Sequence, residues 1–149
     1  MQAYLYSTEN SLDDLFQISP SIRLVKGAYK EPDSTAFPEK PKVDENYFLL
    51  AQKFMNEIKK NDIRIIFATH DEKLIAKIAE DSKKIGLNSD KLEFQMLYGI
   101  KTKLQKQLAK EGFRVRVLIA YGESWYPWYM RRLAERPANI WFVLKNIFS

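Results

Sequence analysis

The sequence contains no cysteine and only one histidine among its 149 residues. The absence of cysteine excludes disulfide bonds, thiolate catalysis and cysteine-based zinc sites, and it fits a reducing compartment such as the cytoplasm. A single histidine excludes the common metal sites built from several histidines, so we expect no metal. The fold must therefore be stabilised by burial of apolar side chains.

Long apolar runs are absent as well. No segment approaches the ~20 residues that cross a bilayer, and the amino terminus lacks the pattern of a secretion signal. The chain has five glycines and six prolines, with 46% hydrophobic and 29% charged residues, which is typical of a globular domain and not of a low-complexity chain. We therefore predict a single cytoplasmic domain, with at most peripheral membrane contact.

The chain carries a net charge of +5 at pH 7. This excess would suit nucleic acid, a phosphate-bearing cofactor or a membrane surface, and by itself it selects none of them. No nucleic-acid recognition motif accompanies the charge, so we expect no nucleic-acid partner.

Strand-like and helix-like segments alternate along the chain, which predicts an α/β fold with a mainly parallel sheet. The β-rich runs cover residues 2–6, 22–27, 63–69, 92–97 and 115–121. Apolar periodicity predicts helices over residues 44–60 and 72–85, and the proline-rich residues 31–41 are predicted to form a long loop. One βα unit takes roughly 30 residues, whereas a (βα)8 barrel takes about 250, so the chain has room for five units of such a barrel. The first strand pattern begins at once, which indicates a chain that starts within a domain.

The predicted strands have two unlike faces. Leu92, Phe94 and Met96 share one face, and the more polar residues between them share the other. Residues 115–121 repeat the pattern. We expect the apolar face to meet the helices, whereas the polar face fits either a bound polar ligand or an open sheet in contact with water.

Candidate chemistry lies at the carboxyl ends of the predicted strands, where α/β proteins usually bind ligands. Arg23, Lys26 and Gly27 combine cations with a residue that permits close approach, which suits a phosphate or a reduced flavin. The same pattern also fits a basic strand end before a turn. Thr69 and His70 end the next run, where they could contact a cofactor; the alternative interpretation is that Thr69 or Asp71 caps the following helix.

A third cluster follows the last strand. Arg131 and Arg132 are adjacent on a predicted helix beside the aromatic residues 125–129, and their guanidinium groups could bind a carboxylate in a bidentate manner. Glu135 lies within reach of both along the helix. A solvated basic helix face is the alternative interpretation.

Taken together, these motifs resemble the flavin-dependent proline dehydrogenases, both the monofunctional enzymes and the corresponding domain of the bifunctional proline utilization proteins. The resemblance covers nearly the whole chain. Its most specific parts are residues 22–29 (IRLVKGAY), 67–70 (FATH), 93–99 (EFQMLYG) and 129–139 (YMRRLAERPAN).

The resemblance implies a distorted (βα)8 barrel that holds FAD over the carboxyl ends of its strands, of which this chain would supply strands four to eight. It places Arg23, the main catalytic candidate, near the flavin N5, where a positive charge stabilises the reduced ring. It implies FAD contacts at Gln2, Arg23, Val25, Lys26, Gly27, Thr69, His70 and Gln95. It also implies that Arg131 and Arg132 bind the proline carboxylate, and that Tyr29 and Leu97 approach the substrate or the isoalloxazine ring.

The implied reaction is the oxidation of L-proline to Δ1-pyrroline-5-carboxylate, with transfer of electrons to a quinone or another acceptor. One substrate-binding position departs from the family pattern, because Leu118 stands where a tyrosine usually covers the proline ring. This difference predicts altered ring selectivity, such as easier entry of hydroxyproline. A second departure is that the early strands, which supply a lysine and an aspartate in the family, have no counterpart here.

Two hypotheses follow from the resemblance. In the first, the chain is the carboxyl-terminal part of a proline dehydrogenase and becomes active when another polypeptide supplies the amino-terminal half. In the second, it is a catalytically silent partial barrel that associates with itself or with a partner through its open sheet edges.

Overall fold

Four parallel strands form one sheet in the computed structural model, which describes residues 1–27, 29 and 31–134 and, for residues 129 and 131–134, the main chain alone. The strands are β1 (Ile22–Val25), β2 (Ile65–Ala68), β3 (Glu93–Leu97) and β4 (Arg114–Leu118). They lie side by side in chain order, and each neighbouring pair is parallel. The helices are α1 (Ser7–Asn10), α2 (Leu12–Phe16), α3 (Lys40–Asn61), α4 (Glu72–Lys84), a short 3-10 helix η1 (Ser89–Lys91), α5 (Thr102–Lys110) and α6 (Trp125–Ala134). The expected α/β fold with a parallel sheet is confirmed.

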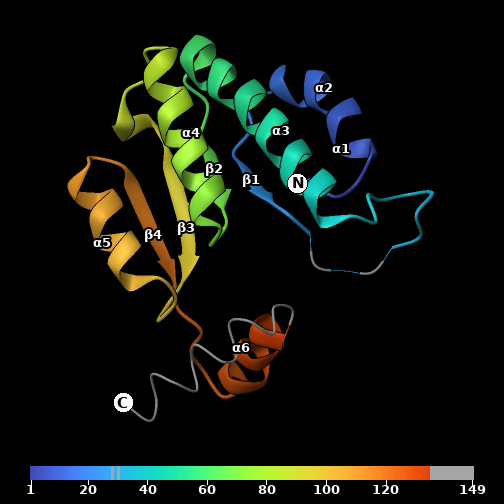
Figure 1. Ribbon diagram of the computed structural model, residues 1–149, viewed down its shortest axis with the longest axis vertical. Coiled ribbons are helices and arrows are strands. Elements are labelled where there is room, and N and C mark those ends of the chain that lie inside the picture. The colour runs from blue at the N-terminus through green and yellow to red at the C-terminus, as the bar shows by residue number, and fades with distance from the viewer. Residues whose placement is uncertain (28, 30, 135–149) are drawn as a thin grey trace.

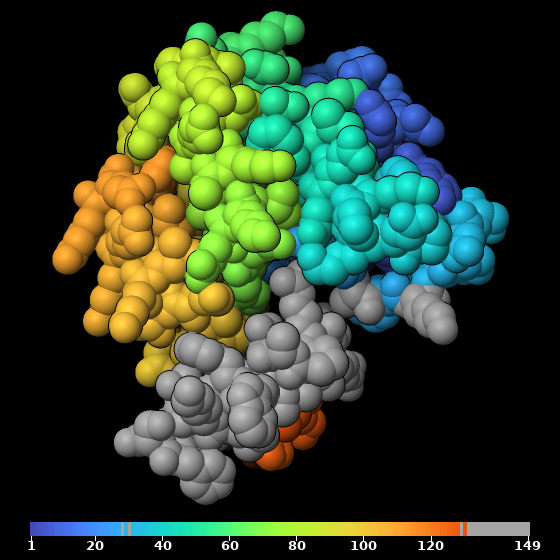
Figure 2. All heavy atoms as spheres, in the orientation of Figure 1, coloured from blue at the N-terminus to red at the C-terminus, as the bar shows by residue number. Residues whose placement is uncertain are grey.

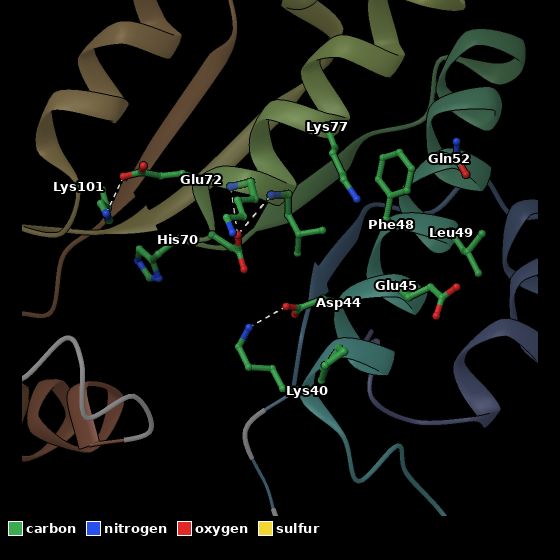
Figure 3. A pocket seen from close by; sticks show the side chains of 14 residues that line it. Lys40, Asp44, Glu45, Phe48, Leu49, Gln52, His70, Glu72, Lys77 and Lys101 are labelled. Atoms are coloured by element: carbon green, nitrogen blue, oxygen red, sulfur yellow. Dashed lines mark hydrogen bonds and ion pairs between the residues drawn. The ribbon is translucent and has the colours of Figure 1, made fainter.

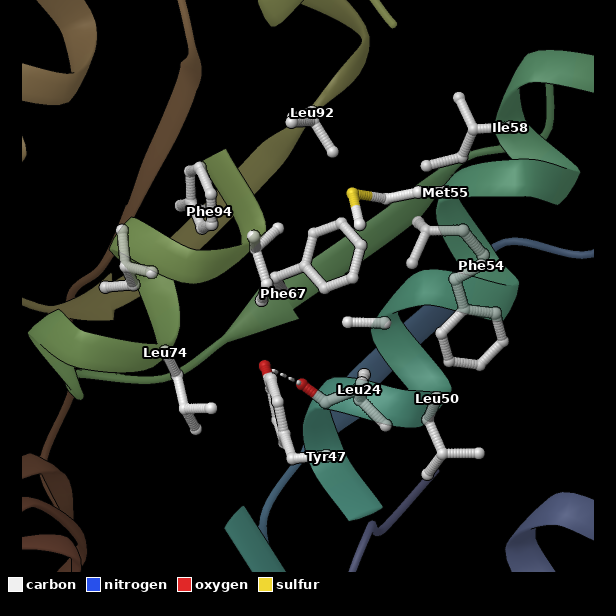
Figure 4. Close-up of a cluster of buried hydrophobic side chains, with 14 of the residues drawn as sticks. Leu24, Tyr47, Leu50, Phe54, Met55, Ile58, Phe67, Leu74, Leu92 and Phe94 are labelled. Atoms are coloured by element: carbon white, nitrogen blue, oxygen red, sulfur yellow. Dashed lines mark hydrogen bonds between the residues drawn. The ribbon is translucent and has the colours of Figure 1, made fainter. Parts of the chain in front are cut away.

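Helices α3 and α4 cover one face of the sheet (Figure 1), and their atoms lie side by side in the space-filling view (Figure 2). The register aligns Leu24, Phe67, Phe94 and Val115 in one row across the four strands. This row faces the helices, and Figure 4 shows its first three members among buried side chains of α3 and α4. Full burial of each large apolar side chain contributes about 1.5–3 kcal/mol, so this layer is the main source of stability. The prediction that the apolar face meets the helices is confirmed.

The helices begin and end where local chemistry directs them. Pro41 lies in the first turn of α3, where its missing N–H costs nothing. Asp71 caps α4 by accepting hydrogen bonds from the main-chain N–H groups of Lys73 and Leu74 at 3.1 and 3.3 Å. Lysines occupy the last turns of both helices and complement the helix dipole. Helix α3 therefore starts four residues before the predicted boundary, which shortens the predicted loop.

The opposite face of the sheet is polar. Arg23, Glu93 and Arg114 share one row on this side, and Gln95 and Arg116 share the next. Glu93 is only 3% exposed because guanidinium groups of Arg64 and Arg116 bind it from both sides, at 2.9 and 2.8 Å. This arrangement satisfies a carboxylate that would otherwise be costly to bury.

The first predicted strand, residues 2–6, is wrong as a strand. Gln2 forms only an isolated parallel bridge with Val25, and the chain then turns, with the Leu5 N–H donating back to the Gln2 carbonyl at 3.3 Å. Ala3 and Tyr4 are both buried, whereas a strand would turn them to opposite faces. The apolar alternation therefore reflects a buried turn beside the edge of β1.

Among the residues that the structure describes, no helix is both long and apolar enough to span a membrane.

Candidate functional site

The polar face carries a hydrogen-bonded pair of side chains that come from within two of the strands. The Arg23 Nε on β1 donates to the Gln95 Oε1 on β3, although these residues lie 72 positions apart in the chain. On β2, which lies between them, Ile66 is in register with Arg23 and the small Ala68 is in register with Gln95. The structure thus brings together the main catalytic candidate and one of the cofactor candidates.

Gly27 follows β1 with a φ of 110°, a conformation that favours glycine. A Cβ at this position would lie 2.1 Å from the ring of Tyr4, so the backbone has been brought close to the buried turn at residues 3–6. Val25, two residues earlier, forms the bridge with Gln2. Gln2 therefore lies beside Val25 at the end of β1, and only a glycine fits at position 27.

Lys26 points away from the polar face. It lies on the same side of β1 as Ile22 and Leu24 and is only 6% exposed. Its ammonium group binds Asp44 of α3, and it binds the Oδ2 of Asp71 at 2.7 Å. Its side chain is therefore committed to two carboxylates on the helix side of the sheet, and a cofactor on the polar face would meet only its main chain.

Asp44 and Asp71 are both held by positive charge. The second carboxylate oxygen of Asp44, Oδ2, accepts a hydrogen bond from the Lys40 ammonium group at 2.7 Å. Burial by itself would raise the pKa of both aspartates, but the hydrogen bonds from the lysines and their positive charge outweigh it, so each pKa lies below its ordinary value. Sequence reasoning paired neither aspartate with Lys26, because 18 and 45 positions separate them from it in the chain.

Thr69 and His70 connect this network to the middle of the sheet. The Thr69 Oγ1 is buried and accepts the Asp71 N–H at 3.1 Å, so both proposed capping residues take part in the start of α4. The His70 Nε2 accepts the Leu97 N–H at 2.9 Å, which places the proton of the neutral imidazole on Nδ1. His70 thereby ties the end of β2 to the end of β3.

Leu97 and Leu118 are register partners at the ends of β3 and β4, and both are half-buried. The Gln105 amide donates to the carbonyls of Leu97 and Ile100, at 3.2 and 2.7 Å, and fixes the turn that follows β3. Tyr29 is 62% exposed. The two leucines thus form an apolar patch next to the Arg23–Gln95 pair.

A groove of about 980 Å³ lies on the helix side, between the amino-terminal parts of α3 and α4 (Figure 3). Its wall includes four lysines, Lys40, Lys73, Lys77 and Lys101, and four carboxylates, Asp44, Glu45, Asp71 and Glu72. The charges balance, so the groove shows no preference for an anion. The polar face with Arg23 is therefore the better candidate for the chemistry.

Arg131 and Arg132 belong to α6, which lies beyond the carboxyl ends of the strands (Figure 1). Their side chains are outside the described part of the structure, and so is Glu135. Their predicted role as a carboxylate clamp stays a prediction.

The sequence model of the proline dehydrogenase family matches residues 1–145. The chain belongs to the proline dehydrogenase family. It is 50% identical over 147 residues to proline dehydrogenase 2 of Bacillus subtilis and 43% identical over 149 residues to the proline dehydrogenase of Deinococcus radiodurans. The alignments cover 99% and 100% of this chain but only 47% of each relative, so the chain spans about half the length of these proteins.

Solved structures of family members agree with the fold. The chain resembles proline utilization A from Bdellovibrio bacteriovorus, solved after inactivation by N-propargylglycine, with a TM-score of 0.78, 29% identity, and coverage of 89% of this chain and 16% of that one. A second proline utilization A structure gives a TM-score of 0.74 at 27% identity, over 90% of this chain and 15% of that one. The proline dehydrogenase family is FAD-dependent.

The described residues fit such a cofactor. Arg23 offers a guanidinium that is hydrogen-bonded to Gln95, and the register places the small side chain of Ala68 beside Gln95. A planar ring that becomes anionic on reduction suits this combination of a fixed cation and small neighbours.

Proposed function

We propose that this chain is the carboxyl-terminal part of an FAD-dependent proline dehydrogenase barrel and takes part in oxidising L-proline to Δ1-pyrroline-5-carboxylate. The observation that carries the proposal is the Arg23–Gln95 pair on the open polar face of a parallel sheet, in a chain of this family. FAD, when bound, would supply the two-electron acceptor for the hydride from the ring carbon next to nitrogen.

The residues of this chain would bind and orient. Arg23 would stabilise negative charge developing beside it, and Gln95 would keep its guanidinium in one orientation. Leu97 and Leu118 would contact the apolar ring of proline, while Arg131 and Arg132 would hold its carboxylate. Gln2, Val25, Lys26, Gly27, Thr69 and His70 would line the cofactor, Lys26 through its main chain.

A second polypeptide would complete the barrel. The relatives are about twice as long as this chain, and one side of β4 has no neighbouring strand within the described residues. An amino-terminal half would supply the remaining strands of the barrel and cover this edge and the polar face. Electrons would leave to a quinone or another acceptor.

Flavin retention tests the proposal. The chain is mixed with the amino-terminal half of Bacillus subtilis proline dehydrogenase 2 and FAD, free flavin is removed, and the visible spectrum is recorded. We expect flavin bands and proline-dependent bleaching in the mixture. Arg23→Met should lower the rate of bleaching ~100-fold or more, because it removes a charge aimed at the developing anion.

Arg64→Met is the matched control, since it removes an arginine from the same face while Glu93 keeps Arg116 as a partner. Equal rates in the two variants would contradict the role of Arg23. No flavin in any mixture would contradict the proposed function.

An alternative function is that of a self-associating module without catalysis. The observation that favours it is the apolar surface on β4 and just after it, where Val117 is 38% and Ile119 is 57% exposed. Such an edge readily pairs with another chain.

A further inference from the structure

The buried ion pairs of Lys26 join three elements at the carboxyl ends of the strands. Lys26 follows β1, Asp44 lies in the second turn of α3, and Asp71 caps α4. Lys26 is 6% exposed, and the two aspartates are 25% and 20% exposed. A lysine in such a place needs these partners, because a buried ammonium without them is very costly.

In both Asp44 and Asp71, each of the two carboxylate oxygens has a partner of its own. Asp44 binds Lys26 with one oxygen and Lys40 with the other. Asp71 binds Lys26 with Oδ2, while its Oδ1 accepts the N–H groups of Lys73 and Leu74. Since each oxygen has its own partner, the position of the Lys26 ammonium also fixes how the first turn of α4 is oriented.

The network continues toward the candidate active site. The Asp71 N–H donates to the Thr69 Oγ1, and the neighbouring His70 accepts the Leu97 N–H. On the other side of Lys26 stands Gly27, whose backbone lies against Tyr4. One continuous set of contacts therefore runs from the end of β1 through the start of α4 to the end of β3.

We propose that Lys26 is a positioning residue that holds the main chain at Gly27, at Thr69–His70 and at Leu97 in the geometry the cofactor requires. It acts through Asp44 and Asp71 from the helix side of the sheet. This inference rests on the proposed function for its consequence, the binding of FAD, but its structural part holds for the chain alone. Without the Lys26 charge, two aspartates would be left near each other in a partly buried place, and the ends of β1 and β2 would loosen.

Two substitutions and one control test the inference. Lys26→Met removes the charge and keeps most of the aliphatic stem, and Lys26→Arg restores a charge. Lys53→Met is the matched control, because Lys53 of α3 likewise forms an ion pair with a carboxylate of another element, Glu9 of α1, but this pair is about half exposed. Exposed pairs of this kind contribute little.

Amide hydrogen exchange on the chain itself is the first measurement. We expect Lys26→Met to speed exchange of the Asp71 and Leu97 N–H groups about tenfold or more, with the core of α3 unchanged. Lys26→Arg should recover most of the protection, and Lys53→Met should match the wild type. Unchanged protection at Leu97 in Lys26→Met would overturn the proposal, as would faster exchange along the whole of α3.

FAD titration of the mixture with the amino-terminal half is the second measurement. We expect Lys26→Met to weaken FAD binding about tenfold and Lys53→Met to leave it unchanged. Equal affinities together with faster exchange would show that the network stabilises the fold without positioning a cofactor site. If the wild type binds no FAD, the proposed function fails, and the exchange result still decides whether Lys26 orders these strand ends.

Discussion

Ala68 shows how a residue with no chemistry of its own shapes the candidate site. It lies on β2 between the strands that carry Arg23 and Gln95, in register with Gln95. A larger side chain there would separate the guanidinium from the amide that orients it. The site thus depends on a small residue in the centre of the sheet as much as on the polar residues beside it.

Leu118 gives a prediction at the same scale. It is half-buried next to Leu97 at the end of β4, and it can offer a proline ring apolar contact but no hydroxyl. We expect Leu118→Tyr to raise the ratio of proline turnover to hydroxyproline turnover about tenfold, because the added bulk and hydroxyl would crowd a hydroxylated ring.

The measurement is kcat/KM for both substrates in the assembled enzyme. Leu118→Met preserves apolar volume and serves as the control, for which we expect the wild-type ratio. A ratio that is the same in all three proteins would refute a role for this position in selectivity.

At the scale of an element, one residue at the start of α4, Asp71, both caps the helix and forms an ion pair. Asp71 caps the helix through Oδ1 and binds Lys26 through Oδ2. Asparagine is also a good capping residue, so Asp71→Asn removes the ion pair but keeps the cap, whereas Asp71→Ala removes both. We expect the alanine variant to be less stable than the asparagine variant by about 1 kcal/mol. Urea unfolding measures the difference, and equal stabilities would show that the cap contributes nothing.

The ion pairs that Lys26 forms with Asp44 of α3 and Asp71 at α4 predict how the stability of the fold depends on pH. The pKa values of Asp44 and Asp71 lie below their ordinary value of 3.8 in the folded chain. The folded state therefore binds fewer protons than the unfolded chain in this range, so the stabilisation is present above about pH 4 and is lost as the pH falls below it. We expect Lys26→Met to cost about 1–3 kcal/mol at pH 7 and less at pH 3.

Urea unfolding of the wild type and Lys26→Met at both pH values checks this expectation. The charged groups that face Lys26 from the packed elements are Asp44 and Lys40 of α3 and Asp71 at α4. A difference between the two proteins that stays constant down to pH 3 would show that these carboxylates do not carry the effect.

At the scale of the whole molecule, β4 is the strand through which we expect association. It is the last strand of the described sheet and leaves Val117 exposed. We expect the isolated chain to self-associate through this edge, and Val117→Lys to shift it toward the monomer, because a charge on an edge strand opposes pairing. Thr102→Lys, which adds the same charge on exposed α5, is the control. Light scattering after size-exclusion chromatography gives the mass, and an unchanged oligomer in Val117→Lys would exclude this edge.

Much of this molecule could be predicted from the sequence, because β2 to β4 and the long helices follow apolar periods that one core imposes. Residues 2–6 could not, since a buried turn that hides both Ala3 and Tyr4 mimics the alternation of a strand. The side of the sheet on which Lys26 lies could be predicted, because the two-residue spacing puts it on the same side as Ile22 and Leu24, which face the core. Its partners were not, because only the packing of α3 and α4 brings Asp44 and Asp71 to it. The roles of the candidate site residues stay predictions.

The order of the strands has a practical consequence. In the described part of the chain, β1 to β4 pair in the order of the sequence, so a cut ahead of β1 separates no pair of these strands. If the proposed function holds, a full-length relative divided at the equivalent point would yield two fragments that bind the visible-light-absorbing flavin only when they reunite. Fused to two other proteins, such fragments would report whether those proteins meet.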